Sequence, residues 1–127
     1  MDNKKILIVE DEEVMQKAIS EAFANQEFTT LTAQDGEEGL AVSLKEHPDL
    51  ILLDILMPKM DGMIMLQKLR QDEWGKGVPV IILTNVNPNT STVINSVLQS
   101  NPAYYLVKSD VKLEGIVDKV KEVLKMN

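Results

Sequence analysis

Residues 50–62 read LILLDILMPKMDG, in which four consecutive aliphatic residues are followed at once by a carboxylate, Asp54. A short aliphatic run with polar chain on both sides is typical of a strand buried on both faces of a parallel sheet. Open α/β sheets bind ligands in the crevice outside the carboxyl ends of their strands, so Asp54 is expected where such folds carry their chemistry. Met57-Pro58 then predicts a turn, and Asp61 predicts the N-cap of a new helix.

The rest of the chain repeats this alternation of apolar run and amphipathic segment. Further strands are expected at 5–9, 29–33, 78–84 and 104–107. Five strands alternating with five helices predict right-handed βαβ crossovers and an α/β fold with a parallel sheet covered on both faces. The helices are predicted from apolar residues spaced three and four apart. They are marked by Ile19 and Phe23, by Leu40 and Leu44, by Leu66 and Leu69, by Val93, Ile94, Val97 and Leu98, and by Ile116, Val117 and Val120, this last helix with Asp110 as its expected N-cap.

The composition bounds the class of protein. At 127 residues, the chain is expected to form one domain, 1–127, with a core of its own. It has no cysteine, and neither a signal peptide nor an apolar run of the ~20 residues that span a membrane is evident. A cytoplasmic location is therefore expected. The net charge of −7 argues against direct binding of nucleic acid.

Polar residues cluster where the predicted strands end. Glu10 and Asp11 follow the first strand, Asp54 the third, Thr84 the fourth and Lys108 the fifth. Because these are all carboxyl ends, they belong to one edge of the sheet. If the first and third strands are neighbours at the topological switch point, the three carboxylates converge there.

Converging carboxylates require a compensating cation. Two carboxylates ~4 Å apart repel by about 4 kcal/mol at an effective dielectric constant near 20. A set of oxygen ligands without imidazole or thiolate selects a hard ion, and a few carboxylates with open positions suit Mg²⁺. With Lys108 and Thr84 at the same edge, the arrangement predicts a phosphoryl-transfer site with Asp54 as the nucleophile.

These motifs together resemble the receiver domain of two-component response regulators, of the stand-alone chemotaxis type. The resemblance rests on the acidic pair after the first strand, Asp54 with Met57-Pro58 and Asp61-Gly62, Thr84, and the run Tyr105-Leu106-Val107-Lys108. It covers essentially the whole chain. It implies a flavodoxin-like sheet of order 2-1-3-4-5.

The resemblance also implies a role for each residue of the cluster. Asp54 would accept a phosphoryl group from a sensor histidine kinase, and Thr84 and Lys108 would hold the phosphoryl oxygens. Asp11 and Asp54 would ligate Mg²⁺ with the backbone carbonyl of Leu56, while Glu10 would act through a water. Tyr105, with Thr84, would act as the switch.

Three positions depart from the pattern of the family. Ser109 follows Lys108 where proline is usual, so a trans peptide bond is expected there. Asn85 follows Thr84 where a small residue is common, which could narrow access to the phosphoryl site. Asn101 stands at a turn usually made by glycine, and asparagine tolerates the left-handed conformation needed.

Several functions stay open. The first is a signalling module that switches a partner-binding surface formed by the fourth helix, fifth strand and fifth helix, without being an enzyme toward other substrates. Its output would be a separate downstream protein or an attached DNA-binding or enzymatic domain, and it would be a monomer or a phosphorylation-dependent dimer. An aspartyl-nucleophile phosphatase is the alternative, but the position for its second carboxylate is Leu56. His47 is expected at the surface, away from the site.

Overall fold

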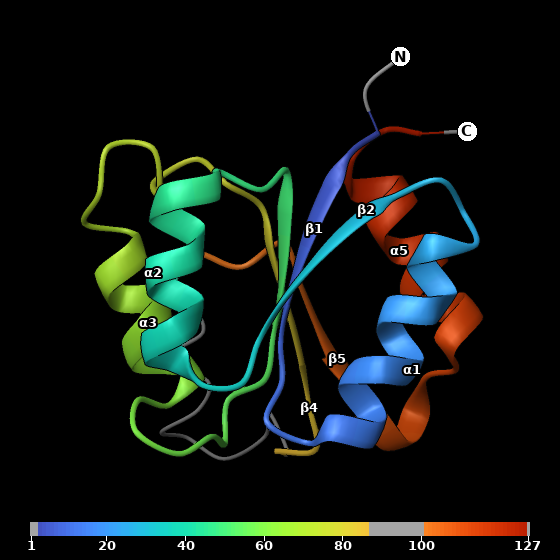
Figure 1. Ribbon diagram of the computed structural model, residues 1–127, viewed down its shortest axis with the longest axis horizontal. Coiled ribbons are helices and arrows are strands. Elements are labelled where there is room, and N and C mark those ends of the chain that lie inside the picture. The colour runs from blue at the N-terminus through green and yellow to red at the C-terminus, as the bar shows by residue number, and fades with distance from the viewer. Residues whose placement is uncertain (1–2, 87–100, 127) are drawn as a thin grey trace.

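The computed structural model describes residues 3–86 and 101–126. It contains one five-stranded sheet of order β2-β1-β3-β4-β5, in which every pairing is parallel, as predicted (Figure 1). The strands are β1 (Lys5–Val9), β2 (Thr29–Ala33), β3 (Leu50–Leu53), β4 (Val80–Thr84) and β5 (Tyr104–Val107). β4 starts two residues later than the apolar run, directly after Pro79, which has no N–H to donate to a ladder.

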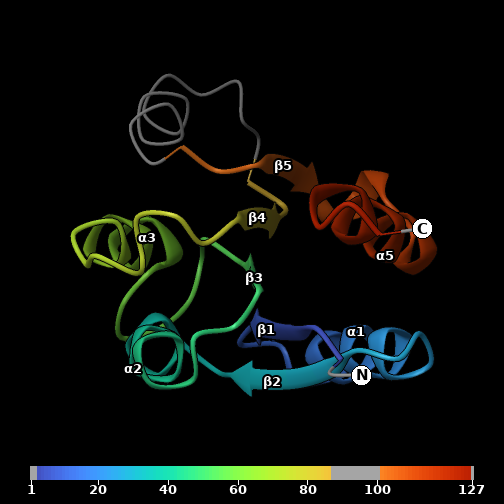
Figure 2. The same cartoon turned by 90° about the horizontal axis from the view of Figure 1, so that it is seen from above.

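Helices cover both faces of the sheet. The described residues include four α-helices: α1 (Glu13–Ala24), α2 (Gly36–Glu46), α3 (Gly62–Leu69) and α5 (Leu113–Val123). Figure 2 shows α2 and α3 on one face and α1 and α5 on the other. The predicted helix marked by Val93, Ile94, Val97 and Leu98 lies outside the described residues. No described helix is both long and apolar enough to cross a membrane.

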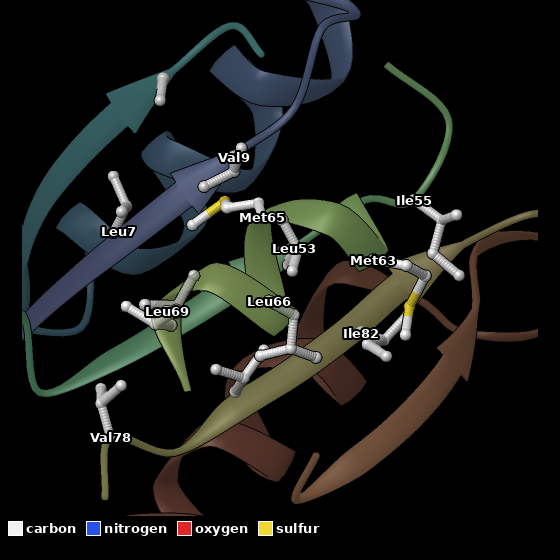
Figure 3. Packing of buried hydrophobic residues seen from close by; sticks show 13 residues of the cluster. Leu7, Val9, Leu53, Ile55, Met63, Met65, Leu66, Leu69, Val78 and Ile82 are labelled. Atoms are coloured by element: carbon white, nitrogen blue, oxygen red, sulfur yellow. The ribbon is translucent and has the colours of Figure 1, made fainter. Parts of the chain in front are cut away.

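The central strands divide their side chains between two apolar cores. Alternate residues of a strand point to opposite faces, so Leu7, Val9 and Leu53 lie under α2 and α3, while Ile6 and Ile8 face α1 and α5. Figure 3 shows the first core, where Met65 and Leu66 of α3 pack over the strands. Burial on both faces explains why the strands read as continuous aliphatic runs.

The start of α3 lies close against the end of β3. The Asp61 side chain accepts a hydrogen bond from the Ile64 N–H at 3.0 Å, which confirms the predicted N-cap. The Gly62 N–H donates to the Ile55 carbonyl at 2.8 Å, and a Cβ on Gly62 would collide with the carbonyl of Asp54. The glycine therefore permits the close approach that sets the loop after Asp54.

One helix start was predicted wrongly. Asp110 ends a single 3₁₀ turn, Lys108–Asp110, instead of capping the last helix. α5 begins at Leu113, after Lys112, which makes no side-chain capping bond. Because the chain already turns directly after Lys108, the regular helix starts three residues beyond Asp110.

Three local expectations are confirmed outside the strands. Asn101 has a φ of 50°, in the left-handed region, and the Lys108–Ser109 peptide bond is trans. His47 is exposed after α2, where its ring stacks on Trp74 with centroids 4.3 Å apart. It follows the helix that leads into the amino end of β3, at the opposite edge of the sheet from Asp54.

Candidate functional site

Asp54 occupies the carboxyl end of the central strand β3. Its backbone N–H donates to the Val9 carbonyl at 3.1 Å, and its side chain is almost buried, with the residue 5% exposed. The carboxylate is fully oriented: Oδ1 accepts the Ile55 N–H at 2.7 Å, and Oδ2 lies 3.1 Å from Lys108 Nζ. One oxygen is thus used to fix the side chain, and the other faces a cation.

The acidic pair after β1 lies beside Asp54, as the sequence predicts. Carboxylate oxygens of Glu10, Asp11 and Asp54 all lie within 4.8 Å of one another. Glu10 is 2% exposed, whereas Asp11 is exposed to solvent. The cluster therefore combines two buried carboxylates with one that water reaches.

Glu10 is held by groups that the sequence analysis did not identify. Its Oε2 accepts the Glu12 N–H at 3.0 Å, and its backbone carbonyl accepts Gln16 Nε2 at 3.0 Å. Gln16 also donates to the Ala33 carbonyl at 3.0 Å, and so ties the loop after β1 to the end of β2. Gln16 lies six residues after Glu10 in an ordinary helical pattern, so no local signal marks it.

Lys108 links the two buried carboxylates. Its Nζ lies 2.5 Å from Glu10 Oε1 and 3.1 Å from Asp54 Oδ2, with Glu12 Oε1 further away at 4.0 Å. Burial by itself would lower the pKa of Lys108, but hydrogen bonds and charge from Glu10 and Asp54 outweigh it, so the pKa is raised above its usual value. The ammonium stays charged at neutral pH and compensates the acidic cluster.

The pKa of Glu10 is also raised, but here burial is the main cause. Burial raises its pKa, and the negative charge of Asp54 adds to the effect, against the lowering influence of Lys108 and the Glu12 N–H. Two nearly buried carboxylates beside one ammonium leave this edge with excess negative charge, which favours binding of a further cation.

Thr84 and Tyr105 complete the edge on the β4 and β5 side. Thr84 is 1% exposed, and its hydroxyl accepts the Val86 N–H at 3.4 Å. The Tyr105 hydroxyl donates to the Val86 carbonyl at 2.7 Å. Burial and the charge of Asp54 raise the pKa of Tyr105, so the phenol senses the charge at the centre of the site.

The loop residue Leu56 and the two unusual residues lie at the surface. The Leu56 side chain is exposed by 66%, and the role of its carbonyl as a ligand stays a prediction. Asn85 and Ser109 are also exposed and contact each other: the Ser109 N–H donates to Asn85 Oδ1 at 3.1 Å. The sequence showed both as departures from a pattern without indicating that they meet.

Taken together, the edge offers three converging carboxylates, two of them nearly buried, with one ammonium and one hydroxyl. The response regulator receiver domain family matches residues 6–121. The chain belongs to this family.

Individual relatives agree with the family match. The probable transcriptional regulator ycf27 of Porphyridium aerugineum is 32% identical over 108 residues, which cover 85% of this chain and 43% of the relative. The chain thus spans less than half the length of this relative. It is a receiver domain of two-component response regulators, the class of protein that serves phosphorelay signalling.

Solved structures show the same fold. The response regulator receiver domain protein (CheY-like) of Methanospirillum hungatei JF-1 has a TM-score of 0.88 and 26% identity, and the match covers 97% of this chain and 94% of that one. The receiver domain of the sensor histidine kinase PA1611 of Pseudomonas aeruginosa PAO1 has a TM-score of 0.84 and 27% identity, with coverage of 94% and 96%. In that structure a magnesium ion is coordinated in the active-site cleft.

Proposed function

We propose that Asp54 accepts a phosphoryl group from a phosphohistidine of a sensor histidine kinase. The observation that carries the proposal is the orientation of Asp54: a backbone N–H fixes Oδ1, while Oδ2 faces the Lys108 ammonium. Oδ2 would form a bond to phosphorus as the phosphorus–nitrogen bond of the donor breaks and the imidazole leaves with the electron pair. Lys108 would then pass from the carboxylate to the phosphoryl oxygens.

Mg²⁺ fits the acidic cluster. The donor set is all oxygen and includes Glu10, Asp11 and Asp54 within 4.8 Å of one another, which suits a hard cation that retains water. Asp11, Asp54 and the Leu56 carbonyl would hold the ion directly, and Glu10 would act through a water. When bound, the ion supplies positive charge that offsets the negative charge of the incoming phosphoryl group.

The consequence of phosphorylation would be a changed surface. An aspartyl phosphate brings roughly two negative charges and strong acceptor oxygens. Thr84 would donate its hydroxyl to them, and Tyr105 would respond because it is bonded to the Val86 carbonyl in the same segment. The altered surface, which includes β5 and α5, would bind a downstream protein or an attached output domain in the cytoplasm. We propose no enzymatic activity beyond the protein's own phosphorylation and dephosphorylation.

Incubation with Mg²⁺ and acetyl phosphate tests the phosphoacceptor. Intact mass should show one added phosphoryl group on the wild type and none on Asp54→Asn, because an amide is not a nucleophile for this transfer. Asp118→Asn, which changes an exposed aspartate of α5, is the control and should label normally. Full labelling of Asp54→Asn would show that another residue is the acceptor.

A further inference from the structure

A hydrogen bond joins the residues that directly follow Thr84 and Lys108. The backbone N–H of Ser109 donates to Asn85 Oδ1 at 3.1 Å. Thr84 and Lys108 are the residues that would hold the phosphoryl oxygens in the proposed function. The bond therefore bridges the two chain segments that reach toward Asp54 from β4 and β5.

This bond links the chain segments that follow β4 and β5, beyond the last residue pair of the two strands. The last register pair of β4 and β5 is Thr84 with Val107. Beyond that pair, Asn85 is held by the Ser109 N–H, and the Val86 carbonyl is held by the Tyr105 hydroxyl at 2.7 Å. Residues 84–86 are consequently tied, one after another, to β5 or to the residue that follows Lys108.

The bond exists because of the residue types at both of its ends. Asn85 supplies a side-chain acceptor that a small apolar residue would lack. Ser109 supplies a backbone N–H that a proline would lack. Two of the three departures from the family pattern, Asn85 and Ser109, thus form one contact.

We propose that the Asn85–Ser109 hydrogen bond holds the Thr84 segment in its resting position and slows uptake of phosphoryl at Asp54. Asn85 is then a positioning residue, and the inference rests on the proposed function of Asp54. In the structure, the Thr84 hydroxyl accepts the Val86 N–H at 3.4 Å, within its own segment. To donate to a phosphoryl group on Asp54, Thr84 must turn away from this contact, and the segment pinned by Asn85 must yield.

The size of the effect follows from the strength of one exposed hydrogen bond. A hydrogen bond that is made in the resting state and lost in the competent state shifts the equilibrium toward the resting state. The population of the competent state falls by the factor that corresponds to the free energy of that bond. Net contributions of single hydrogen bonds correspond to a factor of about two to ten. Breaking the bond should therefore raise the rate constant of labelling about two- to tenfold.

Two substitutions at residue 85 separate the hydrogen bond from the bulk of the side chain. The measurement is the rate constant of labelling by acetyl phosphate in Mg²⁺, followed by intact mass. Asn85→Ala removes the acceptor and most of the side chain, whereas Asn85→Leu removes the acceptor and keeps a similar branched shape. Both should label about two- to tenfold faster than the wild type. Acceleration by Asn85→Ala alone would mean that bulk is responsible, and that result, or an unchanged or lower rate in both, overturns the proposal.

The other end of the bond provides a second, independent test. Ser109→Ala keeps the backbone N–H, and Ser109→Pro removes it. Asn85→Leu should therefore have its full effect in the Ser109→Ala background and none in the Ser109→Pro background. An equal acceleration in both backgrounds overturns the proposal. If Ser109→Pro does not fold, the comparison of Asn85→Ala with Asn85→Leu still decides the matter.

A magnesium titration distinguishes positioning from general loosening of the site. The stabilisation of each variant by Mg²⁺ should equal that of the wild type, because the acidic cluster lies at the ends of β1 and β3. A reduced response to Mg²⁺ in the Asn85 variants would show a wider disturbance and count against the inference. A wild type that does not label removes the proposed function itself, whereas a wild type that labels at the same rate as the Asn85 variants removes only this inference.

Discussion

The two sides of the site are built differently. On the β1 and β3 side, Glu10 and Asp54 stand at the ends of central strands, and backbone N–H groups orient both carboxylates. On the β4 and β5 side, the segment after Thr84 is held by the side chains of Asn85 and Tyr105. The first side is thus oriented by backbone groups of the sheet, and the second by single side-chain hydrogen bonds. In the proposed function, the first side would hold the metal, and the second would rearrange on phosphorylation. Lys108 connects the two.

Replacing Lys108, which connects the two sides, should have the largest effect on stability. Lys108→Met removes the cation between Glu10 and Asp54, whose side chains are almost fully buried. In Mg²⁺-free buffer at pH 7, the free energy of unfolding should fall by about 3 kcal/mol, as for other broken buried pairs. Urea denaturation measures it, and Lys17→Met, at an exposed position of α1, should change it by less than about 0.5 kcal/mol. Equal changes in the two variants would mean that Lys108 does not join the two sides.

Magnesium should act through the β1 and β3 side. At a concentration about one hundred times its dissociation constant, a ligand that binds only the folded state stabilises it by about 2.7 kcal/mol. Mg²⁺ should accordingly raise the melting temperature of the wild type, and Asp11→Ala should abolish the rise because one of the three carboxylates is lost. Glu13→Ala, an exposed acidic residue at the start of α1, should retain it. A rise that persists in Asp11→Ala would place the ion elsewhere.

A smaller effect is expected from Gly62, which allows α3 to approach the loop after Asp54. Gly62→Ala should lower the free energy of unfolding by about 2 kcal/mol, because the added methyl group meets the Asp54 carbonyl. Gly77→Ala is the matched control, since a Cβ there meets no atom within 4 Å. Chemical denaturation of the two variants compares them directly. Equal stability would show that the loop after Asp54 tolerates displacement.

Local pattern was enough to predict most of the fold. The bounds predicted for β2 and β5 agree with the structure, since each is a short run of β-branched, aromatic or aliphatic residues between turn signals. The Asp61 cap agrees for a similar reason, because a capping side chain contacts a backbone N–H only three residues away. The prediction that Asp110 caps the last helix was wrong because Asp110 belongs to a 3₁₀ turn, Lys108–Asp110, and the helix starts after it. The spacing of apolar residues gave no indication of that turn.

The residues of the site were predicted, but most of their contacts were not. Asp54, Glu10 and Lys108 follow strands, and parallel strands bring their carboxyl ends to one edge. With the strand order that the resemblance to the family implied, their meeting could therefore be inferred. The pairing of Lys108 with Glu10, the two bonds of Gln16 and the contact of Asn85 with Ser109 could not. They depend on side-chain directions set by how neighbouring strands and loops pack.

Apolar periodicity and strand-end residues were therefore sufficient to predict the strands, their parallel class and the polar residues at one edge of the sheet, because both act over a few residues of chain. The strand order came from the resemblance to the family, and the chemistry at the edge stays a prediction. Which oxygen of Asp54 faces the ammonium, and which side chain ties the segment after Thr84, became evident only in three dimensions. These contacts join residues far apart in sequence, and their geometry depends on packing between elements that no single segment encodes.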